Sequence, residues 1–201
     1  QDALLEALIK VNENIGVVLV SGNAVAMPWL SKVHAVMQGW YLGSEAGNAL
    51  AAVISGAINP SGKLPFSFPV QLTDNSAHHF GEISYPGNGE YQEYIEDILV
   101  GYRWHDTKNI EPLFAFGHGL SYTNFKISAI NTDKNSYTSK DTIQVSCKVS
   151  NIGIVTGSEV VQVYVGKSTS KVNRATKELK GFKKISVKNE TTGTYIKAIR
   201  S

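Results

Sequence analysis

The residues with the clearest chemical potential lie in one loop, Trp40–Ala49, which reads WYLGSEAGNA. Glu45 is flanked by glycines at positions 43 and 47, and two aromatic residues, Trp40 and Tyr41, precede it. A carboxylate can transfer a proton or accept hydrogen bonds from hydroxyl groups, and aromatic rings pack against the apolar faces of sugars. We therefore expect Glu45, Trp40 and Tyr41 to contact a ligand if this loop lines a site. For Trp40 and Tyr41, packing in the core is the simpler interpretation.

The segments around this loop predict an α/β layer. Val17–Val20 and Val33–Met37 are short apolar runs without alternation, as in parallel strands that are covered on both faces. Asn48–Ser55 is composed of good helix formers, and Gly56 suits the position after a helix. Glu45 would lie at the positive end of this helix, which stabilises a carboxylate anion and argues against a general acid.

Charge divides the chain near residue 120. Residues 1–120 carry 5 Lys/Arg and 12 Asp/Glu, whereas residues 121–201 carry 14 and 5. This break indicates two domains, and the opposite net charges would help them to dock. The basic half lacks interleaved aromatic residues, so we expect a solvated surface and no nucleic acid. No apolar run approaches the roughly eighteen residues of a membrane span. The single cysteine, Cys147, excludes an intramolecular disulfide and is expected to be a buried, unreactive thiol.

In the rest of the chain the spacing of apolar residues changes from helical to irregular and then to strand-like. Asp2–Val11 has the spacing of an amphipathic helix. Residues 71–109 are polar and irregular; Tyr91 is a further candidate for ligand contact there, and the glutamates at 90, 93 and 96 are expected to be solvated. After Tyr122, three strand-like runs separated by polar turns predict an antiparallel β-sandwich: Phe125–Ile130, Thr142–Ser146 and Val160–Val165. His34, inside the second apolar run, is expected to be a hydrogen-bonded core residue.

Blocks of sequence in a fixed order resemble the C-terminal part of glycoside hydrolase family 3, of the β-glucosidase type. They are Gly22–Trp29, Trp40–Ala49, Asn59–Pro69, Val100–Trp104, Glu111–Phe114, Phe116–Tyr122 and Lys177–Phe182. In addition, Val149–Gly153 followed by Gly157–Gln162 resembles the fibronectin type III-like domain that closes many family members. The order of the blocks along most of the chain makes the resemblance specific.

The resemblance implies a partial α/β sandwich domain with a mostly parallel sheet and helices over residues 1–122, then a truncated fibronectin type III-like β-sandwich over 123–201. It also implies a strand near Val100–Arg103. The implied activity is that of a retaining exo-acting β-glucosidase, which uses two carboxyl groups about 5–5.5 Å apart. The family carries its nucleophile on a (β/α)8 barrel and its acid/base in a segment before Gln1, so no catalytic residue is expected in this chain.

The single cysteine excludes a multi-cysteine metal site, and the adjacent histidines at 78 and 79 would point opposite ways in an extended chain, so no metal is expected. No cofactor is expected either. The resemblance implies a β-linked glycoside as substrate, a barrel domain in the same or a partner chain, and a periplasmic or secreted location. Both ends of the sequence read as cuts through a longer protein, and a sandwich without its last strands would need another segment or a homodimer to complete it. Two alternatives stay open: a free-standing carbohydrate-binding or scaffold module, and a flavodoxin-like nucleotide-binding domain, which would lack a phosphate loop.

Overall fold

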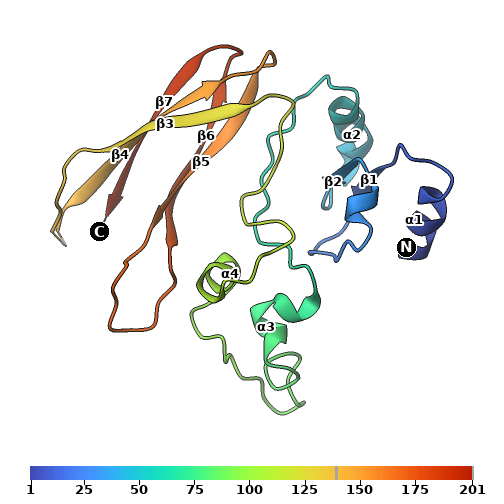
Figure 1. Ribbon diagram of the computed structural model, residues 1–201, viewed down its shortest axis with the longest axis horizontal. Helices are drawn as coiled ribbons and strands as arrows, with labels where there is room; N and C mark the ends of the chain where they lie inside the picture. Colours follow the sequence, from blue (N-terminus) through green and yellow to red (C-terminus); the bar gives the residue numbers. More distant parts are fainter. Residues whose placement is uncertain (139, 201) are drawn as a thin grey trace.

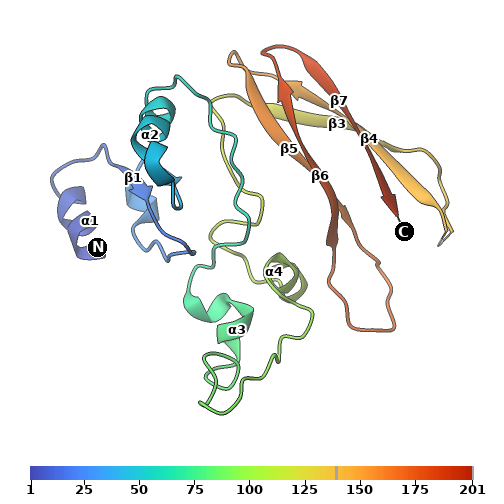
Figure 2. The same cartoon turned by 180° about the vertical axis from the view of Figure 1, so that it is seen from behind.

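The structure, a computed structural model, describes residues 1–138 and 140–200 and consists of an α/β part and a β-sandwich (Figure 1). Two extended segments, 59–69 and 112–122, run side by side between them, and the view from behind shows the same pairing (Figure 2). The backbone of this pair is hydrogen-bonded at Leu64–His118 and at Phe68–Phe114. These two segments are sequence blocks that resemble family 3, and they form the centre of the molecule.

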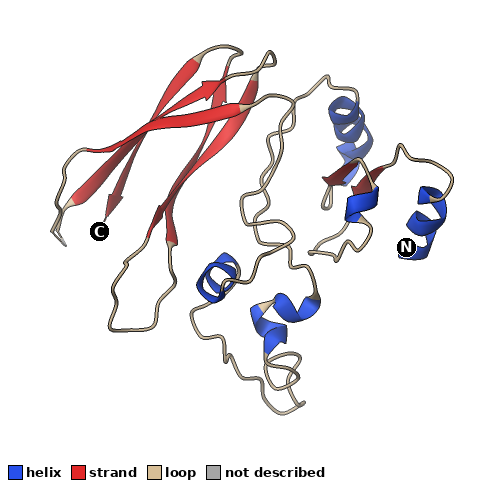
Figure 3. Ribbon diagram, viewed as in Figure 1, coloured by secondary structure: helices blue, strands red, loops and turns tan. Residues whose placement is uncertain are grey.

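The α/β part is built from short elements, as Figure 3 shows by colour. They are α1 (Asp2–Ile9), β1 (Gly16–Leu19), η1 (Leu30–Lys32), β2 (Ala35–Gln38), η2 (Gly43–Glu45) and α2 (Ala46–Ile54). The strands β1 and β2 are parallel, in register from Gly16 opposite Ala35 to Leu19 opposite Gln38. Gly56 has φ +78°, the left-handed conformation expected after the last turn of α2. The predicted helices and parallel strands are therefore present.

The expectation that both strands are covered on both faces is wrong for the described chain. Val18 of β1 is 38% exposed, and Val20, just beyond it, is 62% exposed. His34 is likewise exposed rather than a core residue. The buried core of this part lies on the other side, around Met27, Trp29 and Phe68. Apolar residues occupy both faces of each strand, so the sequence indicates that both faces can be buried. It does not indicate which segment covers each face.

The connection from 71 to 109 is largely irregular, with η3 (Leu72–Asp74), α3 (Ser76–His79) and α4 (Tyr102–Lys108). The strand implied near Val100–Arg103 is wrong, because helix α4 begins there after Gly101, whose φ is +60°. Glu96 is a second correction: it is only 7% exposed and accepts a hydrogen bond from Ser84 Oγ at 3.4 Å. Its neighbours Glu90 and Glu93 are exposed as expected.

The β-sandwich consists of a three-stranded sheet in the order β3–β4–β7 and a two-stranded sheet, β5–β6. The strands are β3 (Phe125–Thr132), β4 (Thr142–Asn151), β5 (Gly157–Val165), β6 (Glu178–Val187) and β7 (Thr192–Arg200). All described pairings within these two sheets are antiparallel. Residues from both sheets meet in one core, which contains Cys147, Val149, Val161, Val187 and Tyr195.

The Thr- and Lys-rich tail after Ile185, in which no strand was expected, forms strand β7 in the described chain. It pairs with β4 from Ser150 opposite Thr192 to Thr142 opposite Arg200. Tyr195 is 2% exposed and Ile199 is 5% exposed, with more exposed residues between them. The period of two is therefore present, but it is obscured in the sequence by the exposed Ile196 on the outer face and by Lys197 on the same face as Tyr195 and Ile199. None of the described helices is long and apolar enough to cross a membrane.

Cys147 is buried in the sandwich core, as predicted, and its thiol has no disulfide partner. Burial raises the pKa of this thiol, so less of the reactive thiolate is present at neutral pH. We expect Cys147 to react with a thiol reagent at least about 100-fold more slowly in the folded chain than in urea. A stopped-flow measurement at pH 8 checks this, and equal rates in both conditions would contradict the buried position.

Candidate functional site

The carboxyl ends of β1 and β2 lie next to each other and form the candidate site. The amide of Gly39 donates to the carbonyl of Leu19 at 2.8 Å, which extends the parallel pairing by one step. Gln38 Nε2 then donates to Ser21 Oγ at 3.1 Å and to the Ser21 carbonyl at 3.3 Å. In open α/β sheets, ligands bind outside this edge, where the loops after adjacent strands converge.

Trp40 begins the loop after β2 and is a core residue in the described chain. Its ring centroid lies 5.3 Å from that of Phe66 and 6.0 Å from that of Phe68, both at edge-on angles. Its φ is +55°, which is uncommon for a bulky residue and fixes where the following residues go. Since its ring packs inward, Trp40 positions the loop.

Tyr41 and Glu45, in contrast, are accessible. Tyr41 is 78% exposed, and its ring lies directly over Gly22, where an added Cβ would come within 2.7 Å of Tyr41 Cε2. Glu45 is exposed at the start of α2 and accepts a hydrogen bond from Asn48 Nδ2 at 2.6 Å. The core alternative for Tyr41 is therefore wrong in this chain. Its ring and the Glu45 carboxylate both belong to the loop at the same strand edge.

Tyr91 lies in a different segment. Its amide donates to Asn88 Oδ1 at 3.0 Å, and its side chain is 55% exposed. Among residues 1–138 and 140–200, no hydrogen bond or ring contact joins Tyr91 to the Trp40–Glu45 loop. The structure thus brings together three of the four predicted contact residues and leaves the fourth apart.

The joint between the two parts is built around Asn59. Its Oδ1 accepts hydrogen bonds from Ser121 Oγ at 2.9 Å and from the Tyr122 amide at 2.8 Å. Its Nδ2 donates to the Thr156 carbonyl at 3.1 Å, in the loop before β5. One amide side chain therefore connects both central segments to the β-sandwich.

Ion pairs also cross this joint. Lys63 Nζ lies 2.9 Å from Glu159 Oε1 and also donates to the Gly119 carbonyl at 2.6 Å. Lys177 pairs with Asp106 at 3.1 Å. The Lys63–Glu159 pair places the cation on the acidic half, so the net charges of the halves do not by themselves explain the docking. A cavity of about 90 Å³, lined in part by Tyr102 and Tyr164, remains beside α4 and is too small for a sugar.

Comparison with known proteins agrees with these features. Residues 1–122 match the family described as glycosyl hydrolase family 3 C-terminal domain, and residues 159–196 match a fibronectin type III-like domain. The chain belongs to glycosyl hydrolase family 3. A beta-glucosidase of Bacteroides ovatus, BoGH3A, is 55% identical over 92% of this chain, and thermostable beta-glucosidase B of Acetivibrio thermocellus is 48% identical over 92%.

Solved structures extend the likeness of the family 3 chain to three dimensions. DesR, a beta-glucosidase from Streptomyces venezuelae solved in complex with D-glucose, is 42% identical over 99% of this chain with a TM-score of 0.92. Beta-glucosidase 3B from Thermotoga neapolitana, solved with alpha-D-glucose, is 34% identical over 92% with a TM-score of 0.83. The chain spans about a quarter of the length of these relatives: 25% of BoGH3A and 25% of DesR.

Sequence reasoning missed two residues of this family 3 chain that position the site and the joint. Gln38 ends β2 and holds the β1 loop, but it looks like an ordinary polar residue after an apolar run. Asn59 begins the NPSGKLP block, and its partners Ser121 and Thr156 are far away in the sequence. The one indication in the sequence that Asn59 could be important was that Asn59–Pro69 and Phe116–Tyr122 are both blocks that resemble the family.

Proposed function

We propose that this chain is the C-terminal portion of a retaining, exo-acting β-glucosidase-type hydrolase, which removes terminal β-linked sugars from a non-reducing end. The observation that supports this most strongly is the similarity in sequence and structure to beta-glucosidases, which extends over 92–99% of the chain and both parts of the structure. Residues 1–122 would be the later part of the α/β sandwich domain, and residues 123–201 the fibronectin type III-like domain.

The distribution of exposed apolar side chains supports a larger assembly. Leu4 and Val11 around α1, Val20 after β1, and Ile54 of α2 are 62–81% exposed. Parallel strands are nearly always covered on both faces, so this surface suits contact with further protein. We propose that the remaining α/β strands and a barrel domain, in the same chain or a partner chain, cover it.

In this arrangement the chain supplies a wall of the pocket and no catalytic carboxyl group. The exposed Tyr41 ring would pack against a sugar face, and Glu45 would accept hydrogen bonds from sugar hydroxyls. Trp40 would hold the loop in place. Tyr91 would act only if the rest of the protein brings its segment to the pocket.

Activity measurements test this function. The intact protein that carries this chain should hydrolyse 4-nitrophenyl β-D-glucopyranoside, and residues 1–201 alone should not exceed a mock preparation. Hydrolysis by residues 1–201 well above the mock preparation would contradict the proposal, because the catalytic groups would then lie in this chain.

The candidate wall residues can be tested in the intact enzyme. We expect Tyr41→Ala and Glu45→Gln each to raise KM for the aryl glucoside about tenfold, because each removes a contact worth about 1–2 kcal/mol. The control Glu13→Gln removes an exposed carboxylate outside the loop and should leave KM unchanged. An unchanged KM in both loop variants would show that the loop does not line the sugar site.

A binding module without catalysis is the second candidate, favoured by the exposure of Tyr41 and Tyr91, at 78% and 55%. It predicts saturable binding of glucose or cello-oligosaccharides to residues 1–201 alone, seen as a change in tryptophan fluorescence. A flat titration up to millimolar sugar excludes it.

A further inference from the structure

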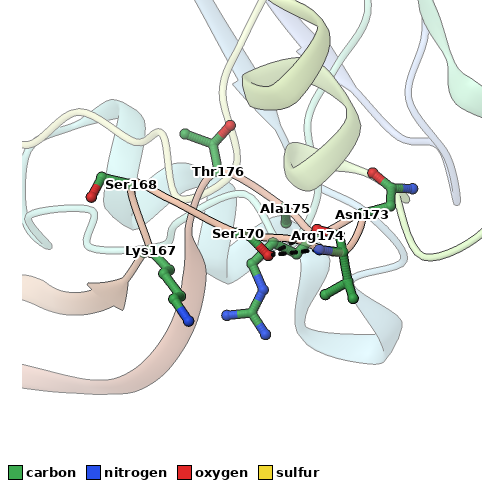
Figure 4. Close-up of a pocket in the computed structure, with 9 residues that line it drawn as sticks. Lys167, Ser168, Ser170, Asn173, Arg174, Ala175 and Thr176 are labelled. Atoms are coloured by element: carbon green, nitrogen blue, oxygen red, sulfur yellow. Dashed lines mark hydrogen bonds between the residues drawn. The ribbon is translucent and has the colours of Figure 1, made fainter.

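A loop between β5 and β6, Gly166–Thr176, lines an open surface cavity of about 510 Å³ (Figure 4). This volume lies within the range of small-ligand sites in proteins. The loop forms the far end of the β5–β6 hairpin, on the side of α4 (Figure 1). Neither the candidate site at β1 and β2 nor the joint around Asn59 includes any of its residues.

The base of this loop is held in place by the α/β part. Ala175 is 3% exposed and packs with Leu99 and Trp104. The amide of Thr176 donates to Thr107 Oγ1 at 3.1 Å, at the end of α4. An added Cβ on Gly166 would overlap the Thr176 carbonyl, so the two ends of the loop lie in close contact. The base of the loop is therefore held in position against α4.

The charge of the loop is one-sided. It carries Lys167, Lys171 and Arg174, and no Asp or Glu occurs between Glu159 and Glu178. The carboxylates of Asp106 and Glu178 pair with Lys177 and Lys180. Lys180 lowers the pKa of Glu178 most, and the charge of Arg174 contributes a smaller part. In the described part of the chain, none of the three loop cations has an ion-pair partner within 4.0 Å.

Neutral polar side chains line the same cavity as the cations of the loop. Lys167 and Arg174 stand on opposite arms of the loop and extend toward the same side (Figure 4). Ser168 and Asn173 line the same cavity and offer a hydroxyl and an amide. A guanidinium fits a carboxylate through two parallel hydrogen bonds, and a nearby ammonium adds a second charge. Hydroxyl and amide groups are the partners that sugar hydroxyls use.

We propose that the Gly166–Thr176 loop binds the carboxylate of an acidic carbohydrate, with Arg174 and Lys167 on the carboxylate and Ser168 and Asn173 on neighbouring hydroxyls. The site goes beyond the proposed glucosidase function, since a terminal neutral sugar carries no charge. It would hold a uronic-acid-bearing glycan away from the residues that contact the reacting sugar.

The test uses the intact protein and isothermal titration calorimetry with tetragalacturonate, maltotetraose and inorganic sulfate. We expect saturable binding of tetragalacturonate and none of maltotetraose. Lys167→Gln/Arg174→Gln should weaken that binding about tenfold or more, because it removes both charge-assisted contacts. The control Lys126→Gln/Lys148→Gln removes the same charge from exposed positions on β3 and β4 and should change affinity less than twofold.

Three results would overturn the proposal: no saturable binding of tetragalacturonate, equal weakening by both double variants, or sulfate binding as tightly as tetragalacturonate. The last two would indicate attraction by net charge alone. Because the readout is binding, failure here leaves hydrolysis of the aryl glucoside unaffected, and the two proposals can fail separately. Asn173→Ala adds a further check, since loss of a hydroxyl contact should weaken tetragalacturonate but not sulfate.

Discussion

Replacing Gly119 by alanine is expected to destabilise the folded chain by about 3 kcal/mol, the upper part of the range for overpacking. An added Cβ at this position would overlap the carbonyl oxygen of Gly62 and lie 3.0 Å from Lys63 Cδ. The obstacle is backbone, so the two central segments must separate for the methyl group to fit. Lys63 bonds the Gly119 carbonyl and pairs with Glu159, and we therefore expect the joint to loosen as well.

Urea unfolding of the Gly119→Ala variant measures this effect, and Gly62→Ala is the matched control. Gly62 lies on the opposite segment, where an added Cβ meets nothing within 4 Å. The control should change the unfolding free energy by less than about 0.5 kcal/mol. Equal effects in the two variants would show that the segments are not packed as closely as the structure has them.

The second large effect concerns Asn151, at the end of β4. It is 2% exposed and accepts hydrogen bonds from Thr123 Oγ1 at 2.6 Å and from the Gly153 amide at 3.1 Å. Its Nδ2 donates to the carbonyls of Val155 at 2.8 Å and Val187 at 3.2 Å. Asn151→Ala would leave several buried polar groups without partners, and we expect a loss of about 3 kcal/mol.

Differential scanning calorimetry checks this second prediction against Asn131→Ala. Asn131 is exposed on β3 and makes one local hydrogen bond, from its Nδ2 to the Ala129 carbonyl at 3.0 Å. The midpoint of Asn151→Ala should fall by about 6–10 °C, while that of Asn131→Ala stays within about 1–2 °C. A small effect at Asn151 would mean that water replaces its partners and that the residue is not the link between β4 and β6.

Local pattern predicted the regular elements well. Ala46–Ile54 follows from its helix formers and ends before Gly56, whose φ of +78° favours glycine. Strands with alternating apolar residues, such as β4, were found for the same reason. Strand β7 was missed because Ile196 on the outer face and Lys197 on the inner face break the apparent alternation of Tyr195 and Ile199. Helix α4 was missed because the expectation for Val100–Arg103 came from the resemblance alone.

The candidate site was predictable only in part. Trp40, Tyr41 and Glu45 are close in sequence, so their proximity in space could be predicted. Which of them are exposed could not. The positive φ of Trp40 turns its ring toward Phe66 and Phe68 and leaves Tyr41 outside. The position of Tyr91 depends on how the irregular connection from 71 to 109 folds, and no periodic pattern in the sequence predicts that. Asn59 and Lys63 depend on partners at Thr156 and Glu159, nearly one hundred residues away.

The most direct test of the central claim is the mass of the protein that carries this chain, measured on native material by intact mass spectrometry together with gel filtration. If the chain is the wall and support of a glycosidase, the species should be several times heavier than 21.8 kDa, or should carry a stable partner chain with the barrel. A monodisperse monomer of 21.8 kDa in native material would contradict the account and favour the binding module.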